Sequence, residues 1–249
     1  MIKRTSFGPL AEIWDAKSGN EGVKSMRHNT KTLISLLGKP KGKLVYEIAT
    51  GNGFLARKLS DAGAIVTASD ISPELIDIAT HKYDVKNIKY SVREATNFKG
   101  LGKNKFDAVI IHQGIFYIKN IDALAKGASS ILKPGGVMIF TMLHPLFRVL
   151  KARTEEGRAA DRLAEIFKQA EAYRTNTGKE TSKKWKVDKT IHKINYYAYR
   201  RPLNFYVNAL AKHGLFTQQI IEPASKNVRD DKIINSPIPS IYIVKVVKI

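Results

Sequence analysis

Short apolar runs alternate along the chain with segments whose apolar positions recur every three or four residues. The runs have the length and composition of β-strands, and the segments between them have the period of amphipathic helices. From about Leu44 to Phe140 this alternation predicts a parallel sheet covered on both faces by helices. The predicted strands are 44–48, 65–70, 87–92, 106–111 and 137–140, with helices over 54–62, from 73 through 79, and from 121 to about 132.

Local signals mark the ends of two of these helices. Ser72, Pro73 and Glu74 supply an N-cap, a proline at the first helical position and an acidic first turn. The Lys-Pro-Gly-Gly sequence at 133–136 stops the helix that begins at 121 before the fifth strand starts.

The alternation breaks down after the fifth strand. Residues 148–201 contain an amphipathic helical pattern followed by a lysine- and tyrosine-rich extended stretch, and we interpret them as a cap insertion; the helical face consists of Leu163, Ile166, Phe167, Ala170 and Tyr173. Pro202 then begins a helix that Gly214 ends. The last two predicted strands, 216–221 and 241–247, are joined by a proline-containing loop, so we expect an antiparallel pair at the sheet edge.

The composition is that of one globular domain. A chain of 249 residues with 43% hydrophobic residues can bury one large core. No stretch approaches the roughly 18 uncharged apolar residues of a membrane-spanning helix, and the N-terminus leads into no apolar signal region. The chain has no cysteine, which excludes disulfides and thiolate metal sites. We therefore expect a cytoplasmic protein without a membrane segment.

The charge balance is strongly basic. Lys and Arg number 42 against 22 Asp and Glu, which gives a net charge of +20 and a field that attracts anions such as nucleic acid. The excess is spread along the chain rather than gathered in one run, as a coding bias could also produce. A nucleic-acid partner is therefore possible, but charge alone does not establish one.

The strongest chemical signal is the turn after the first predicted strand, Glu47-Ile48-Ala49-Thr50-Gly51-Asn52-Gly53. Small residues there let a ligand approach the backbone, and the next helix presents free N–H groups at its N-terminus. Asp70 ends the neighbouring strand, where a carboxylate can accept hydrogen bonds from both hydroxyls of a ribose. Two turn glycines and a helix-capping aspartate are the purely structural alternative.

Two cofactor classes fit this turn. Gly51-x-Gly53-x-x-Ala56 also satisfies the dinucleotide fingerprint, so the charge of the ligand has to decide. Glu47, at the tip of its strand, would repel a pyrophosphate, whereas it would attract the sulfonium and amino groups of S-adenosylmethionine. The roughly 40 residues before the first strand also differ from a dinucleotide domain, which begins close to that strand. The residues therefore favour S-adenosylmethionine.

On these residues the chain resembles the class I S-adenosylmethionine-dependent methyltransferases, and in particular their small single-domain bacterial and archaeal members. The turn from Glu47 to Gly53 resembles their first motif, with Ala49 in place of the usual first glycine, and this alanine demands an ordinary negative φ. Further matches are Asp70-Ile71-Ser72, Glu94-Ala95, Phe106-Asp107-Ala108-Val109 and Leu132-Lys133-Pro134-Gly135-Gly136. The resemblance is dense over about 44–140 and looser over 205–249.

This resemblance implies a Rossmann-like α/β fold, with a seven-stranded, mostly parallel sheet, an antiparallel last strand, helices on both faces and a small cap insertion. The whole of 1–249 would be a single methyltransferase domain. Residues 1–43, which include Trp14-Asp15 and Gly19-Asn20, would form a helical segment that covers the cofactor, and 148–201 would form the cap.

The resemblance also implies the residues that bind the cofactor. Asp70 would hold the ribose, and the Glu94-Ala95 pair would lie beside the adenine. The expected cofactor-binding set is Glu47, Ala49, Gly51, Gly53, Asp70, Ile71, Glu94, Ala95, His112 and Gln113.

The reaction of this family is an in-line displacement that leaves S-adenosylhomocysteine, so alignment of donor and acceptor matters more than a fixed catalytic group. His112 and His144 follow the fourth and fifth strands and could act as general base, although a structural histidine explains each of them equally well. The acceptor would contact Tyr117, His144, Tyr199 and Arg200. The carboxylates that would hold magnesium after the fifth strand are missing, so we predict an enzyme without a metal ion.

The acceptor remains open at this point. The residues after the fourth strand lack the Asn/Asp-Pro-Pro-aromatic element of base-amine methyltransferases, which favours a small-molecule acceptor. An RNA or protein methyltransferase that uses the basic surface is the nearest alternative. An NAD-dependent oxidoreductase and a non-catalytic cofactor-binding protein are alternatives from other classes. The oligomeric state does not follow from the sequence.

Overall fold

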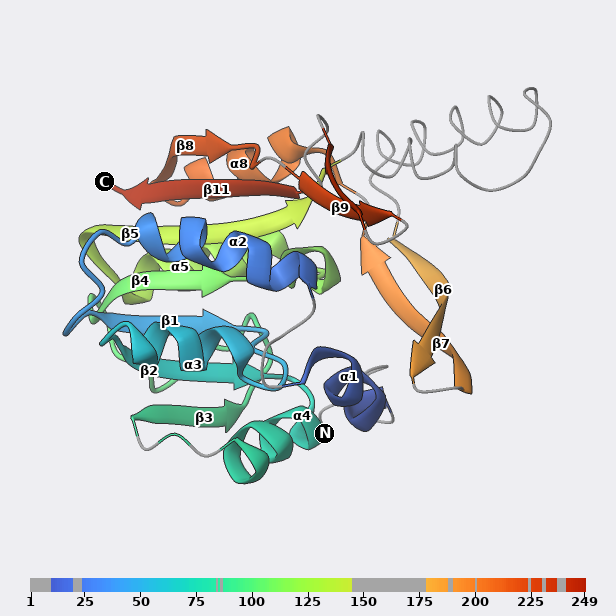
Figure 1. Cartoon of the computed structure of the whole chain (residues 1–249). Coiled ribbons are helices and arrows are strands. Elements are labelled where there is room, and N and C mark those ends of the chain that lie inside the picture. The colour runs from blue at the N-terminus through green and yellow to red at the C-terminus, as the bar shows by residue number, and fades with distance from the viewer. Residues whose placement is uncertain are drawn as a thin grey trace.

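The computed structural model describes residues 10–19, 24–83, 85, 87–144, 178–187, 190–199, 201–223, 225–229, 232–236 and 241–249. Seven strands form one sheet in the order β3-β2-β1-β4-β5-β11-β8 (Figure 1). The strands are β1 Leu44–Ile48, β2 Ile65–Asp70, β3 Ile88–Val92, β4 Phe106–Ile111, β5 Leu132–Leu143, β8 Leu215–Ile221 and β11 Ile241–Lys248. Neighbours among β1 to β5 pair in parallel, whereas β11 runs antiparallel to both β5 and β8. The Rossmann-like fold expected from the sequence is confirmed.

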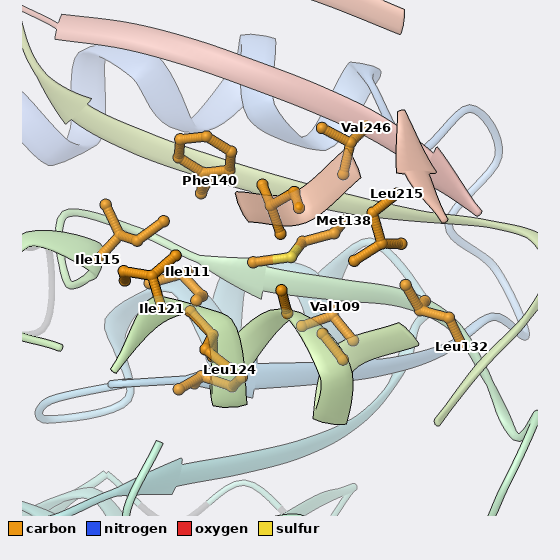
Figure 2. Packing of buried hydrophobic residues seen from close by; sticks show 14 of the residues in the cluster. Val109, Ile111, Ile115, Ile121, Leu124, Leu132, Met138, Phe140, Leu215 and Val246 are labelled. Carbon is orange, nitrogen blue, oxygen red and sulfur yellow. The ribbon is translucent and has the colours of Figure 1, made fainter. Parts of the chain in front are cut away.

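Helices cover both faces of the sheet (Figure 1). On one face, α2 and α3 pack against alternate side chains of β1, β2 and β4, and on the other face α5 and α8 pack against the intervening ones. Figure 2 shows the second core, a cluster that includes Val109 and Ile111 of β4, Met138 and Phe140 of β5 and Leu124 of α5. The helices are α1 Ala11–Ser18, α2 Lys24–Ser35, α3 Phe54–Asp61, α4 Pro73–Asp77, α5 Ile121–Ile131 and α8 Leu203–Ala211, with a π-helical turn over Ile78–Lys82 and a 3-10 turn over Ile115–Tyr117.

The local start and stop signals behave as expected. The Ser72 hydroxyl accepts a hydrogen bond from the Leu75 N–H, which caps α4. Asn120 caps α5 in the same way through the Ala123 N–H. Gly214 follows α8 with a φ of +76°, a conformation that favours glycine.

The second half of the chain departs from the sequence prediction at the start of β5 and in the loop between β8 and β11, whereas the lysine- and tyrosine-rich stretch is extended as predicted. β5 was expected to begin after the Lys-Pro-Gly-Gly turn, but it begins at Leu132, before that turn. Leu132 pairs with Phe106 of β4, and a register shift between Phe106 and Ala108 accommodates the turn. The lysine- and tyrosine-rich stretch forms a hairpin of β6 Gly178–Val187 and β7 Thr190–Tyr199, and a second hairpin, β9 Ser225–Arg229 with β10 Lys232–Ser236, lies between β8 and β11 in the sequence. The helix expected over 163–173 falls outside the described residues.

The closing strands pair as predicted, with one refinement. β8 and β11 are antiparallel neighbours, but β11 lies between β5 and β8, so β8 is the edge strand. Among the described residues, no helix combines the length and the apolar character needed to cross a membrane.

Candidate functional site

Two buried carboxylates lie at the carboxyl ends of β1 and β2. Glu47 is 2% exposed, and its Oε2 accepts a hydrogen bond of 2.7 Å from the Thr50 hydroxyl. Asp70 is 8% exposed and accepts hydrogen bonds from two backbone N–H groups, that of Gly51 at 2.9 Å and that of Ser72 at 3.0 Å. Asp70 therefore ties the turn after β1 to the turn after β2.

The charges of the two carboxylates are only partly compensated by their surroundings. Within the described residues, neither Glu47 nor Asp70 forms an ion pair with a lysine or an arginine. Burial raises the pKa of Glu47 to about 8, since the Thr50 hydroxyl and the charge of Arg57 offset only part of the lost hydration and the charge of Asp70 adds to the shift. Burial also raises the pKa of Asp70, against the lowering effect of its backbone hydrogen bonds. A cation bound next to the carboxyl ends of β1 and β2 would restore the lost stabilisation of both charges.

The turn after β1 corrects one expectation. Ala49 has a φ of +58°, so the prediction of an ordinary negative φ is wrong. The chain has to reverse at this position between β1 and α3, and it keeps the left-handed conformation although the side chain costs about 1–2 kcal/mol there. A Cβ on Gly114, in the turn after β4, would lie only 2.7 Å from the Cβ of Ala49. The absence of a side chain at Gly114 thus leaves room for the methyl group of Ala49.

The two glycines of the turn both have positive φ, +60° at Gly51 and +76° at Gly53. A Cβ at Gly51 would lie 3.5 Å from the Trp14 indole nitrogen, and one at Gly53 would collide with the Tyr90 hydroxyl. The backbone of the turn is therefore closely approached from two sides, and a side chain at Gly53 would have to displace Tyr90.

The N-terminal helix α1 is attached to this turn by a buried polar cluster. The Asn52 Nδ2 donates to Asp15 Oδ1 at 2.7 Å, to Ser18 Oγ at 3.0 Å and to the Gly19 carbonyl at 3.1 Å. Lys82 reaches the other oxygen of Asp15 at 2.5 Å. Burial alone would raise the pKa of Asp15, but its hydrogen bonds, first that of Asn52, lower it below the usual value. The Trp14-Asp15 segment thus packs on the turn after β1, and Figure 1 places α1 beside the carboxyl ends of β1 and β2.

The turn after β4 also has a strained backbone. His112 is 4% exposed, and Gln113 has a φ of +54°. The Thr141 hydroxyl on β5 lies 2.9 Å from His112 Nδ1 and accepts a hydrogen bond of 2.7 Å from the Gln113 N–H. The buried Nε2 of Gln113 has no hydrogen-bond partner among the described residues, so it is a donor available to a ligand.

The remaining cofactor candidates lie beside Asp70. Ile71 follows it directly, and the turn after β3 is joined to it because the Arg93 N–H donates to the Asp70 carbonyl at 2.8 Å. In that turn Glu94 is exposed and Ala95 is half-buried against the core.

The acceptor candidates are more scattered. His144 is 3% exposed, packs on the Tyr242 ring at 4.4 Å between ring centroids, and has its Nε2 3.5 Å from a Glu222 carboxylate oxygen. Tyr117 packs on a neighbouring phenylalanine ring, and Tyr199 lies under the guanidinium of Arg201 at 4.4 Å from the ring centroid. Arg200 lies outside the described residues. Over the residues that the structure describes, no group of three His, Asp or Glu side chains is arranged to hold a metal ion.

Sequence reasoning missed two residues that organise this edge. Arg201 donates to the carbonyls of Ile118 at 2.7 Å and Lys119 at 2.6 Å, which joins the end of β7 to the loop after β4. Thr141 holds the turn at His112 and Gln113. A single threonine inside the apolar run Ile139-Phe140-Thr141-Met142-Leu143 was the one available signal, and threonine is common in strands.

The strand order and the crossover connections define an α/β domain of the Rossmann-like class, in which ligands bind in the crevice outside the carboxyl ends of the strands. Comparisons with known proteins agree with this. Residues 46–140 match the family model described as a methyltransferase domain. The chain is 27% identical over 141 residues to the ubiquinone biosynthesis O-methyltransferase of Xanthomonas axonopodis pv. citri, a match that covers 55% of this chain and 59% of that protein. The chain thus spans about three fifths of the length of this curated relative.

Solved structures show the same fold over nearly the whole chain. An S-adenosylmethionine-dependent methyltransferase from Mesorhizobium loti aligns with a TM-score of 0.61 and 16% identity, over 92% of this chain and 100% of that one. A chain in the complex between the Haloferax volcanii Trm112 methyltransferase activator and a methyltransferase aligns with a TM-score of 0.65 and 16% identity, over 98% of both. The fold is thus that of the class I S-adenosylmethionine-dependent methyltransferases, and residues 46–140 match their methyltransferase domain.

Proposed function

We propose that this protein transfers the methyl group of S-adenosylmethionine to a small-molecule acceptor without a metal ion. One observation carries the proposal: two buried carboxylates, Glu47 and Asp70, lie at the carboxyl ends of neighbouring strands with raised pKa values and no lysine or arginine ion-paired to either in the described chain. Such a pair attracts a cationic ligand and repels a phosphate-bearing one.

The residues of the crevice fit the methyl donor. Each oxygen of the Asp70 carboxylate has one backbone N–H partner and keeps a lone pair for a ribose hydroxyl. Glu47 would take the amino group, and the orphaned Nε2 of Gln113 would donate to the ligand. Ala49, Gly51 and Gly53 keep the turn thin enough for close approach, while Ile71, Glu94 and Ala95 would flank the adenine. S-adenosylmethionine supplies a methyl group activated by its sulfonium.

The protein's own contribution to transfer is alignment, exclusion of water and, where the acceptor is protonated, removal of a proton. His112 and His144 follow β4 and β5 at the edge where ligands of open α/β sheets bind, so both are candidates for contact with the acceptor. Tyr117, Tyr199 and Arg200 would line the acceptor side. The α1 segment would cover the donor.

The acceptor class is inferred from the relatives. The curated relative is named as an O-methyltransferase of ubiquinone biosynthesis, which makes a hydroxyl on a small ring compound the first acceptor class to test. The basic surface keeps RNA in the test as the competing acceptor.

The cofactor is tested by calorimetric titration of the purified protein with S-adenosylmethionine, S-adenosylhomocysteine and NADH. We expect both adenosyl compounds to bind and NADH not to. Binding of NADH alone would overturn the proposal. The acceptor is tested with radiolabelled methyl donor against phenolic and catechol compounds, total RNA and a protein extract, and transfer into RNA rather than into any small molecule would replace the acceptor class while leaving the donor intact.

A further inference from the structure

The hydroxyl of Thr141 joins the two residues that follow β4. Thr141 is fully buried on β5, in the register position next to the pair of Phe140 with Ile111. Its Oγ1 lies 2.7 Å from the Gln113 backbone nitrogen and 2.9 Å from His112 Nδ1. Both distances are those of good hydrogen bonds.

The direction of these two hydrogen bonds follows from counting donors and acceptors. A backbone N–H can only donate, so Thr141 Oγ1 accepts from Gln113. The hydroxyl then still has one hydrogen to donate, and within the described part of the chain His112 Nδ1 is the acceptor in reach. A buried hydroxyl hydrogen without an acceptor is costly. His112 Nδ1 is therefore unprotonated, and the neutral ring has its hydrogen on Nε2.

We propose that Thr141 is a positioning residue that sets both the left-handed turn at Gln113 and the Nε2–H tautomer of His112. The inference rests on the proposed function, because these two residues lie where the methyl donor and acceptor would meet. In this arrangement His112 presents a hydrogen-bond donor at Nε2. Protonation of Nδ1 would reverse this hydrogen bond and leave the hydroxyl hydrogen of Thr141 without its acceptor. His112 thus serves to orient a ligand rather than to act as general base.

The same hydroxyl stabilises the strained backbone of the turn. Gln113 is one of only three non-glycine residues with positive φ among the described residues. Its N–H would lie buried beside β5 without a partner if Thr141 lost its oxygen. Through the Gln113 backbone, Thr141 therefore also fixes the position of the Gln113 side chain, whose Nε2 has no hydrogen-bond partner among the described residues. It fixes the His112 ring directly.

The test compares wild type with Thr141→Val, which keeps the shape and removes the hydroxyl, and with Thr141→Ser, which keeps the hydroxyl. Histidine labelled with ¹⁵N reports the tautomer of His112 in the ligand-free protein, with the resonance assigned by its loss in His112→Gln. We expect Nδ1 to be unprotonated and hydrogen-bonded in wild type and in Thr141→Ser, and the Nδ1 resonance to shift in Thr141→Val. We expect Thr141→Val to bind S-adenosylhomocysteine about ten-fold or more weakly, and Thr141→Ser to restore binding to within about three-fold.

A wild-type His112 with its hydrogen on Nδ1 would overturn the proposal, as would an unchanged spectrum and affinity in Thr141→Val. The wild-type spectrum decides the tautomer even if Thr141→Val does not fold. If wild type bound no adenosyl compound, the proposed function would fail while the tautomer measurement still judged the role of Thr141.

Discussion

Carboxylates have opposite environments at the two ends of the parallel strands. We call these ends the amino edge and the carboxyl edge of the sheet. At the amino edge, Asp107 of β4 forms an ion pair with Lys133 at 2.6 Å and accepts the Leu44 N–H at 2.8 Å. Burial works against it, but these partners, Lys133 first, hold the pKa of Asp107 below its usual value. At the carboxyl edge, Glu47 has no such ion pair, and burial raises its pKa to about 8. The first carboxylate is neutralised within the fold, whereas the second, which the proposed function assigns to a cationic ligand, has no ion pair among the described residues.

The backbone shows the same contrast. At the amino edge the positive φ angles fall on glycines such as Gly42, Gly63, Gly102 and Gly135, with Asn104 as the one non-glycine residue described there. At the carboxyl edge they fall on Ala49 and Gln113 as well as on glycines. Left-handed non-glycine residues cost free energy and persist where the surroundings require them, which is typical of functional sites. Among the described residues, the carboxyl edge, where Glu47 and Asp70 lack an ion pair, thus has two left-handed non-glycine residues and the amino edge has one.

The largest expected effect on the contrast between the two edges comes from removing the charge of Glu47. Its pKa rises from 4.5 in the unfolded chain to about 8 in the fold, so the folded state holds a proton that the unfolded state releases. The ligand-free protein should lose stability as pH rises from about 4.5 to 8, by about 1.4 kcal/mol per unit of pKa shift. Glu47→Gln mimics the protonated acid, so its unfolding free energy at pH 8 should exceed that of wild type by an amount on the order of a few kcal/mol.

Urea unfolding at pH 5.5 and pH 8 measures this effect. Asp61→Asn is the matched control, because Asp61 is exposed near the amino edge. Equal stability of Glu47→Gln and wild type at pH 8 would show that Glu47 is ionised in the fold without a ligand.

The same variant should bind S-adenosylmethionine more weakly, and wild-type affinity should rise with pH up to about 8, since the cation binds to the ionised form.

Removal of Asp70 should act on the ligand more than on the fold. Asp70→Ala loses the acceptor for the ribose hydroxyls, and we expect cofactor affinity to fall by about 1–3 kcal/mol in calorimetry. Asp77→Ala, on the exposed side of α4, is the control and should bind normally. An Asp70→Ala protein that folds and binds with unchanged affinity would mean that the ribose is held elsewhere.

The strain at the carboxyl edge can be tested through one contact. Gly114→Ala would place a Cβ 2.7 Å from that of Ala49, so it should destabilise the fold by about 1 kcal/mol or more. In the background of Ala49→Gly this collision disappears, so the same change should cost less than half as much. Urea unfolding of the four proteins gives the coupling energy. Strict additivity of the two changes would show that Ala49 and Gly114 do not restrain each other.

The sequence predicts the strands next to the crevice well and its fine geometry poorly. β1, β2 and β4 match their predicted bounds because each is an apolar run closed by polar or small residues. Glu47 and Asp70 were predicted at the tips of these strands for the same reason. The predicted sign of the Ala49 φ angle was wrong and the role of Thr141 was missed, because both depend on contacts between segments far apart in the chain. The β9–β10 hairpin carries no apolar periodicity that would have predicted it.

The amino edge should be the least sensitive region. Lys103 and Lys105 are exposed there, and β4 separates them from the crevice by six residues, or about 20 Å. This exceeds the Debye length of about 8 Å at 0.15 M salt, so a Lys103→Ser, Lys105→Ser protein should bind S-adenosylmethionine within about two-fold of wild type. At 0.01 M salt the screening length is about 30 Å, so the loss of two positive charges should then strengthen binding of the cation slightly. S-adenosylhomocysteine, without the sulfonium charge, should respond less. A large loss of affinity at 0.15 M would instead place these lysines in contact with the ligand and would remove the distinction between the two edges.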